Sequence, residues 1–422
     1  MRAHPSMISI PYWAAAIVTG FVAVGYTVIF TKAEEISLLV LKEYPLYFFV
    51  LSPLSLLLGW YLVFRVAPAA QGSGVPQVMA AMDLAEVKHK DNLLQRLLQL
   101  RIVFVKIISS SLCVLGGGGV GREGPTVQIA SITFCWVGKK FQRIWHNFNP
   151  ETWLVAGGAA GVAAAFNTPL GGIVYAIEEL ASVHFSKFKA AIISSVIIAG
   201  LIAQWLLGPY LFLGYPKLKA FSIPVLVLAL FIGGICGISG ALFGKLLFWA
   251  ATKKKQIKNT AYLVGLICIS GLAIAATGFY LGADAIGSGK EALLDTLFKG
   301  LTLDWRLAVA RFVVPVITYI CGCAGGIYAP ALAAGGTMGY LFAQVTGIVY
   351  TNTAALLGMI AFLTGVTRAP FTAFVLVLEM TDRHSAIFPM MTAALFASSF
   401  ARIVDKHSFY HHMKRQILDS AN

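Results

Sequence analysis

The stretch VLGGGGVGREGPTVQIA, residues 114–130, holds two charged side chains between glycines and a proline, inside a run that is otherwise apolar. Arg122 and Glu123 would be costly there if the run simply crossed a membrane as one helix. Glycine permits a sharp entry of the chain, and proline is favoured at the start of a helix. The segment GREGP therefore predicts a helix that begins in the interior of the protein.

Hydrophobic residues make up 58% of the 422 residues and charged residues only 12%. That balance is typical of a membrane protein, and a helix that spans a bilayer needs about 20 apolar residues. The long runs of low charge are 9–31, 45–64, 102–121, 190–213, 223–250, 261–281 and 385–400. We therefore expect an all-α polytopic membrane protein whose first run is retained as a span rather than cleaved as a signal peptide.

The net charge of +14 collects in short basic stretches such as KKKQIK (253–258) and HHMKRQ (411–416). Under the positive-inside rule these stretches mark cytoplasmic loops, so we expect the lipid bilayer and not a nucleic acid as the partner. The six cysteines form neither a disulfide framework nor a zinc-site spacing. We expect no metal, no cofactor and a single membrane domain.

The motifs recur in the same order in the two parts of the chain. GSGVP (72–76), GREGP (121–125) and FNTPLGGIVYAIEEL (166–180) are followed by GSGKE (287–291), GGIYAP (325–330) and TRAPFTAFVLVLEM (367–380). Both Pro169 to Glu178 and Pro370 to Glu379 are nine positions apart. We predict a duplication with halves 1–221 and 222–422, the second ending in a C-terminal helix on the cytoplasmic side.

The placement of basic residues indicates that the two halves are inverted relative to each other. Segments such as 125–137 are too short to span a bilayer, which is typical of the broken, tilted helices of transporters. In an inverted repeat the substrate site lies near the midplane, where broken helices from both halves meet.

Each of GSGVP, GREGP and GGIYAP predicts a helix start with unpaired N–H groups and the positive end of the helix dipole. The residues that define these starts are Gly72, Gly74, Pro76, Gly121, Arg122, Gly124, Pro125, Gly326 and Pro330. Taken singly, such a motif can be only a tight turn that helps helices pack. Three starts in an ordered repeat indicate an anion site instead.

Glu123 is understandable at such a site, because its carboxylate can occupy the place of an anion and leave when it is protonated. Ser73 offers a hydroxyl donor to the same site, although a serine before a helix can also be a simple cap. For Arg122 we expect a structural ion pair or a contact with the aqueous face rather than a contact with the substrate.

The motifs GSGVPQ, GREGPTVQI, AAFNTPLGGIVYAIEEL, GGIYAPAL and RAPFTAFVLVLEMTD together resemble those of the CLC family of chloride channels and chloride/proton exchangers, over nearly the whole chain. The resemblance implies a homodimer with one pore per subunit and inverted halves in each subunit. It implies transport of chloride and protons rather than enzyme activity, and a prokaryotic plasma membrane. Because the sequence stops at Asn422, we expect none of the nucleotide-binding CBS domains that many members carry.

Carried over by motif, Ser73 would be the hydroxyl ligand of chloride, and the N–H groups of Ile327 and Tyr328 would complete its coordination. The serine goes with a preference for chloride in this family. Tyr410 would supply a second hydroxyl, and its alternative role is that of a tyrosine at the membrane interface. Family members usually have phenylalanine where Tyr328 stands, so an additional hydroxyl enters the site. Glu123 would be the external gating glutamate.

Exchangers of the family pass protons through a second glutamate on the cytoplasmic side, and Glu179 falls at that position. Glu178 and Glu379 are instead expected to be helix-end carboxylates in ion pairs. Lys106 lies in an apolar run and should have a partner.

Family members can carry an acidic residue six positions after the serine ligand, where this chain has Met79. Asp83 or Glu86 could take its place.

Three functions compete at this point. Chloride/proton exchange is favoured by Glu123 and Glu179, and a passive chloride channel would leave Glu179 without a role. An intramembrane hydrolase would use Ser73 or a histidine. Five of the eight histidines are placed by the sequence in loops or at segment ends, namely His184, His384, His407, His411 and His412.

Overall fold

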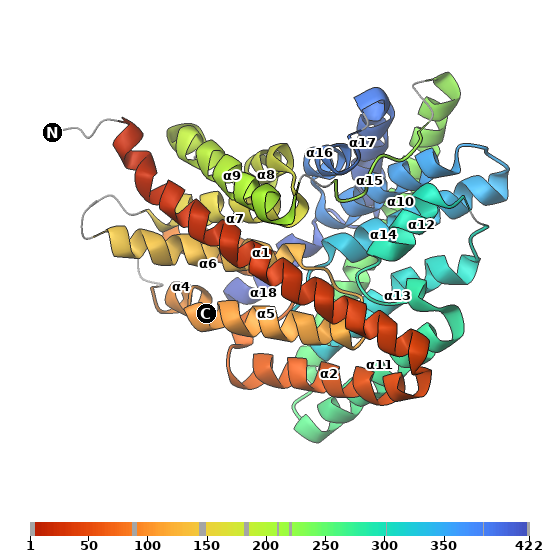
Figure 1. The fold of residues 1–422 in the computed structure, drawn as a ribbon, viewed down its shortest axis with the longest axis horizontal. Coiled ribbons are helices and arrows are strands. Elements are labelled where there is room, and N and C mark those ends of the chain that lie inside the picture. Colours follow the sequence, from red (N-terminus) through yellow and green to blue (C-terminus); the bar gives the residue numbers. More distant parts are fainter. Residues whose placement is uncertain are drawn as a thin grey trace.

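The computed structural model describes residues 5–86, 91–142, 149–180, 185–208, 211–218, 222–300, 302–382 and 384–419. Over these residues the fold is helical, with no strand beyond two isolated bridges (Figure 1). The earlier helices are α1 (Pro5–Glu43), α2 (Pro45–Arg65), α3 (Val75–Glu86), α4 (Asp91–Leu97), α5 (Leu100–Leu115), α6 (Glu123–Phe141), α7 (Pro150–Phe166), α8 (Pro169–Tyr175) and α9 (Phe185–Leu207).

The later helices are α10 (Ile223–Gln256), α11 (Thr260–Leu281), α12 (Lys290–Phe298), α13 (Trp305–Cys321), α14 (Tyr328–Thr346), α15 (Thr351–Thr367), α16 (Pro370–Thr381), α17 (Ile387–Val404) and α18 (Phe409–Asp419). Single turns form η1 (Pro68–Ala70), η2 (Ala176–Leu180), η3 (Ala283–Ala285) and η4 (His384–Ala386).

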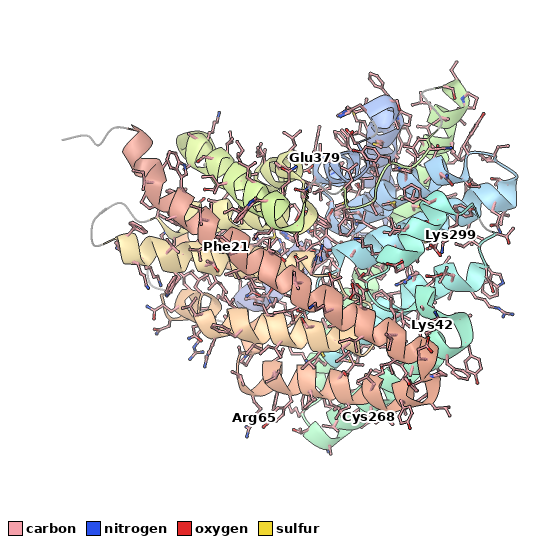
Figure 2. The ribbon with its side chains drawn as sticks, viewed as in Figure 1. Phe21, Lys42, Arg65, Cys268, Lys299 and Glu379 are labelled. Carbon is pink, nitrogen blue, oxygen red and sulfur yellow. The ribbon has the colours of Figure 1, made fainter. Side chains whose placement is uncertain are left out.

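Seven helices of the described chain are long and apolar enough to cross a membrane, and they coincide with the seven predicted runs. They are Ser9–Glu43, Pro45–Arg65, Asn92–Leu115, Lys189–Leu207, Ile223–Gln256, Thr260–Leu281 and His384–Val404. Large apolar side chains on them are exposed, as Phe21 of α1 is in Figure 2. Exposed apolar surface on this scale suits contact with lipid. The polytopic, all-α prediction is confirmed.

Short helices fill the interior of the molecule. Every residue of α15 from Thr353 to Thr367 is buried, and α14 packs closely along it. A Cβ added at Gly339 would overlap the Ala354 carbonyl, and one at Gly358 would overlap the Gly335 carbonyl. Small residues at such contacts let membrane helices approach each other closely. Because protein rather than lipid surrounds these helices, they need not match the thickness of a bilayer.

The structure corrects two expectations about boundaries. The short segment 125–137 belongs to α6, which has 19 residues because the helix continues through Lys139 and Lys140. The basic stretches 253–258 and 411–416 are not simple loops. Lys253–Lys255 close the last turn of α10, where cations interact favourably with the helix dipole, and 411–416 lie within α18.

The backbone repeats as well as the sequence. Gly72 and Gly74 have φ values of +67° and +101°, and Gly287 and Gly289 have +70° and +92° at the matching places. Asn167 and Arg368, each two positions before a proline, are left-handed with φ values of 57° and 64°. The same unusual conformations in the same order support the predicted duplication.

Candidate anion and proton site

Backbone pairing joins the loops before α3, α6 and α14. The N–H of Gly72 donates to the Cys323 carbonyl at 3.0 Å, and the N–H of Gly325 donates to the Gly72 carbonyl at 3.0 Å. Gly121 and Gly326 exchange two hydrogen bonds of 2.9 and 2.7 Å. The structure therefore brings together the three predicted helix starts, which begin at Val75, Glu123 and Tyr328.

Glycine is required where these loops meet. A Cβ at Gly124 would overlap Ser73 Oγ and would lie 3.3 Å from the Cα of Gly326. At Gly74 the backbone is left-handed, and a Cβ would lie 2.8 Å from the Cβ of Gln128. The glycines of the motifs thus permit the close approach of three helix N-termini, whose free N–H groups favour an anion.

Ser73 and Tyr410 are brought together from opposite ends of the chain. Both are buried, and Ser73 Oγ donates to Tyr410 Oη at 3.5 Å. The buried ammonium of Lys106 donates to the carbonyls of Ala70 and Gly72, each at 2.9 Å. Lys106 therefore has the partner that its burial requires, and it fixes the loop that carries Ser73.

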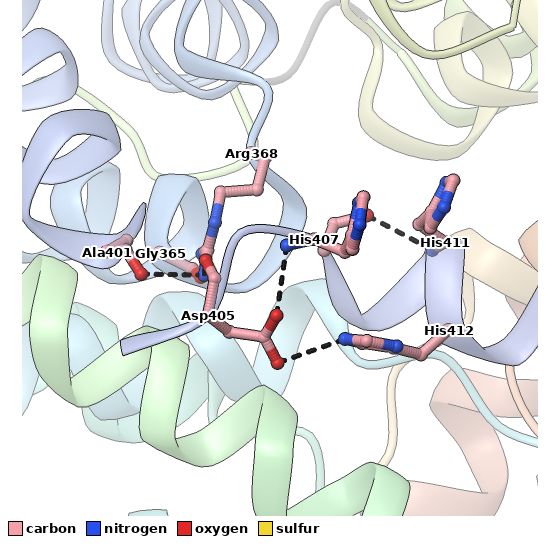
Figure 3. Close-up of polar contacts among 8 residues, drawn as sticks. Gly365, Arg368, Ala401, Asp405, His407, His411 and His412 are labelled. Atoms are coloured by element: carbon pink, nitrogen blue, oxygen red, sulfur yellow. Dashed lines mark hydrogen bonds and ion pairs between the residues drawn. The ribbon is translucent and has the colours of Figure 1, made fainter. Parts of the chain in front are cut away.

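Interactions within α18 and just before it fix the position of Tyr410. Lys414 forms an ion pair with Asp83 of α3 at 2.9 Å, so Asp83 binds α18, and Met79 is partly buried in the core. The side chain of Glu86 lies outside the described residues. Before α18, Arg368 donates to the carbonyls of Gly365, Ala401 and Asp405, the last two at 3.0 Å (Figure 3).

Asp405 connects that arginine to α18: its carbonyl accepts from Arg368, and the contacts with residues next to and within α18 are made by its carboxylate. It accepts from the N–H of His407 at 3.0 Å and contacts His412 Nε2 at 3.0 Å, as Figure 3 shows. Partial burial alone would raise the pKa of Asp405, but the His407 N–H and the His412 ring outweigh it and hold the pKa below its usual value. The His407 and His411 rings stack at 4.4 Å. These contacts anchor the helix that presents Tyr410.

The Glu123 side chain is buried at the start of α6 and points to the start of α14. The N–H of Ala329 is close enough to hydrogen bond to the Glu123 carboxyl. A Cβ added at Gly121 would overlap Glu123 Oε2, which has no hydrogen-bond partner within the described ranges. A carboxylate thus lies where two helix N-termini meet, which is the arrangement expected of a tethered competitor for an anion.

Arg122 does not have the contacts expected from the sequence. It is buried, and its guanidinium donates to Thr31 Oγ1 at 3.0 Å and to the Ala165 carbonyl at 3.5 Å. It also lies 5.9 Å from the centre of the Phe212 ring. Arg122 forms no ion pair among the described residues. Arg122 instead joins α6 to α1 and α7, because a buried guanidinium needs acceptors on neighbouring elements.

Glu179 lies on the π-helical turn η2, and Tyr328 Oη donates to Glu179 Oε1 at 2.9 Å. The ring of Tyr328 stacks on that of Tyr410, with centroids 6.1 Å apart and planes at 22°. Tyr328 begins α14 directly after Ile327, so the N–H groups of both residues belong to a helix start. The candidate anion ligands and Glu179 are therefore connected through one side chain.

Glu178 and Glu379 do not form the predicted ion pairs. Glu178 accepts from the N–H groups of Phe371 and Thr372, and Glu379 accepts from those of Leu170 and Gly171. In the described part of the chain neither has a cationic partner. The expectation was wrong because a helix N-terminus attracts a carboxylate as a cation does.

Sequence reasoning missed an open cavity of about 710 Å³. Basic side chains and the end of the Ser73 loop line it, including Arg96, Arg101, Lys254, Lys255, Gln71 and Tyr319. The KKKQIK stretch indicated some of the basic side chains, but whether they line a cavity depends on how α10 packs near α5 and α18.

No described histidine hydrogen bonds to Ser73, whose side-chain partner is Tyr410. His184 lies outside the described residues. The geometry therefore gives the hydrolase hypothesis no nucleophile and base in contact.

Comparisons with known proteins agree with this geometry. A sequence profile described as voltage gated chloride channel matches residues 54–402. The H(+)/Cl(-) exchange transporter ClcA of Vibrio vulnificus (strain YJ016) is 30% identical over 83% of this chain and 76% of its own length. The protein of the same name from Salmonella paratyphi A is 31% identical over 97% of this chain and 89% of its own.

Solved structures share the fold. A slow cyanobacterial Cl-/H+ antiporter superimposes with a TM-score of 0.85 at 23% identity, over 99% of this chain and 100% of its own. A CLC-type fluoride/proton antiporter gives a TM-score of 0.80 at 20% identity, over 98% and 99% of the two chains. The profile match over most of the chain and relatives at 30% identity or more lead to one conclusion: this multi-pass membrane protein belongs to the voltage gated chloride channel family, the CLC family of chloride transporters.

Proposed function

We propose that this protein exchanges chloride for protons across the membrane. The observation that carries the proposal is the position of Glu123, whose buried carboxyl faces the Ala329 N–H where the starts of α6 and α14 meet. A carboxylate and a chloride ion would compete for these N–H donors. Protonation removes the charge of the carboxylate and so favours the anion, which couples the two ions.

In this proposal Ser73 Oγ, Tyr410 Oη and the N–H groups of Ile327 and Tyr328 bind chloride at the centre of the protein. Glu123 is the gate. Glu179 supplies protons from the cytoplasmic side, since it is connected to the site through Tyr328 Oη at 2.9 Å. Relatives that are named H(+)/Cl(-) exchange transporters support exchange rather than passive conduction.

The organisation, assembly and location of the protein are proposed from the same similarity to its relatives. The halves 1–221 and 222–422 form two units, two copies of the chain form a homodimer, and the protein acts in a prokaryotic plasma membrane rather than as an enzyme. Covalent crosslinking in membranes tests the homodimer, and a monomer there would contradict it.

The test of exchange is proton movement in liposomes that contain the purified protein. A chloride gradient is imposed, and a potassium ionophore sets the membrane voltage. We expect protons to move against their own gradient, driven by chloride. Chloride flux without proton movement would make the protein a passive channel and would leave Glu179 without a part in transport.

A further inference from the structure

The hydroxyl of Tyr328 is hydrogen-bonded to Glu179, the carboxylate that the proposed exchange uses as its proton donor on the cytoplasmic side. Tyr328 Oη donates to Glu179 Oε1 at 2.9 Å; Tyr328 is buried and Glu179 is partly buried. The phenylalanine that the family resemblance implies at this position would have no such group. We propose that Tyr328 relays protons between Glu179 and the anion site through this hydroxyl; the inference rests on the proposed exchange function.

Tyr328 is suited to a relay because it contributes to the proposed chloride site and also contacts Glu179. It is the first residue of α14, so its backbone N–H is at the proposed chloride site while its side chain reaches η2. Its ring stacks on Tyr410, with centroids 6.1 Å apart, and packs with its centroid 6.4 Å from that of Phe166 at the end of α7. Contacts with two rings hold the phenol in a fixed orientation toward Glu179.

Oxygen atoms near Tyr328 are acceptors for the relayed proton. Tyr175 and Tyr410 lie close enough to interact electrostatically with both Glu179 and Tyr328. In the described chain, Tyr175 Oη and Glu179 Oε2 are buried oxygens without a hydrogen-bond partner, as is Glu123 Oε2. Buried oxygens of this kind usually bind ordered water. In the proposed relay, water bound near Tyr175 Oη accepts the proton that leaves Tyr328.

The relay step conserves protons and charge. When Glu179 is protonated, its O–H donates to Tyr328 Oη, which reverses the hydrogen bond seen in the structure. The O–H bond of Glu179 then breaks as a new one forms to Tyr328 Oη, and the original phenol proton leaves to the oxygen of a water molecule. Tyr328 remains neutral, and one proton has moved from Glu179 toward Glu123.

A purely structural role for this hydroxyl makes a different prediction. If Tyr328 Oη only satisfies a buried carboxylate, its removal changes the amount of folded protein or the rate of both ions together. A relay changes the number of protons moved for each chloride. The ratio of the two fluxes therefore separates the two roles.

The experiment measures proton and chloride fluxes in the same liposomes for the wild type and Tyr328→Phe. Tyr12→Phe is the matched control, because Tyr12 is also buried but stacks on Trp153 at 4.0 Å, away from the site. We expect chloride flux to persist in Tyr328→Phe while the proton flux per chloride falls about tenfold, as loss of a hydrogen bond to a charged group implies. Tyr12→Phe should keep the wild-type ratio.

If Tyr328→Phe keeps the wild-type ratio, the relay is wrong while exchange stands. If the wild type itself moves no protons, exchange fails, and the relay fails with it. Should Tyr328→Phe move no chloride, the test passes to Tyr175→Phe, which removes the neighbouring hydroxyl. A lowered ratio in that variant supports the relay, and an unchanged ratio overturns it.

Discussion

Glu178 caps the start of α16, and Glu379 caps the start of α8. Glu178, in η2 directly after α8, accepts from Phe371 and Thr372 at the start of α16 at 3.1 and 2.6 Å. Glu379, near the end of α16, accepts from Leu170 and Gly171 at the start of α8 at 3.0 and 2.6 Å. The two helices pack together, and Figure 2 labels Glu379 in that region. A reciprocal contact of this kind is what a two-fold axis produces.

Replacing Glu178 with alanine should lower stability by about 1–2 kcal/mol, because two N–H groups at the start of α16 lose their acceptor. Glu379→Ala should have a similar effect on α8. Thermal unfolding of the purified protein in detergent measures both changes. Glu43→Gln, at an exposed position at the end of α1, is the control. Equal midpoints for Glu178→Ala and the control would contradict a stabilising cap.

Glu123→Gln should keep chloride transport and stop proton transport. The amide is close in shape to the carboxyl but carries no charge, so it neither competes with chloride as an anion nor carries a proton through the cycle. Liposome fluxes of both ions check this, and the wild type is measured in parallel. A Glu123→Gln protein that still pumps protons against their gradient would remove the gate from the proposal.

Lys106→Met should weaken chloride binding and destabilise the protein. The carbonyls of Ala70 and Gly72 would lose a charged donor just before Ser73, at a cost of about 2 kcal/mol. Calorimetric titration with chloride and thermal unfolding measure the two effects. Lys42→Met, at an exposed position at the end of α1, should change neither. Wild-type chloride affinity in Lys106→Met would show that this bond does not shape the site.

Asp405→Asn should loosen the anchor of α18 and reduce chloride affinity about fivefold, since a charged acceptor is lost. The folded pKa of Asp405 lies below its ordinary value of 3.8, because the His407 N–H and the His412 ring outweigh its partial burial. A lowered folded pKa contributes stability above the unfolded pKa, and that contribution is lost as the pH falls through the folded pKa. The stability difference between wild type and Asp405→Asn should therefore shrink as the pH falls below about 3.8. A difference that grows on acidification would contradict this assignment.

The sequence by itself determined the features that depend on neighbouring residues. Apolar runs located the seven candidate spans, and glycine and proline located the starts of α3, α6 and α14, since these residues act through their own φ angles and N–H groups. The end of α6 was missed because Lys139 and Lys140 are helix formers outside the apolar pattern.

Only the tertiary structure decided which groups pair across the chain. Ser73 and Tyr410 are 337 positions apart, Tyr328 and Glu179 are 149 apart, and Glu379 lies 209 positions from Leu170. Hydrogen bonds form within about 3.5 Å, so these partners depend on how α8, α14, α16 and α18 pack. The residue types predicted that each group needs a partner. The packing of the helices determined which partner each group has.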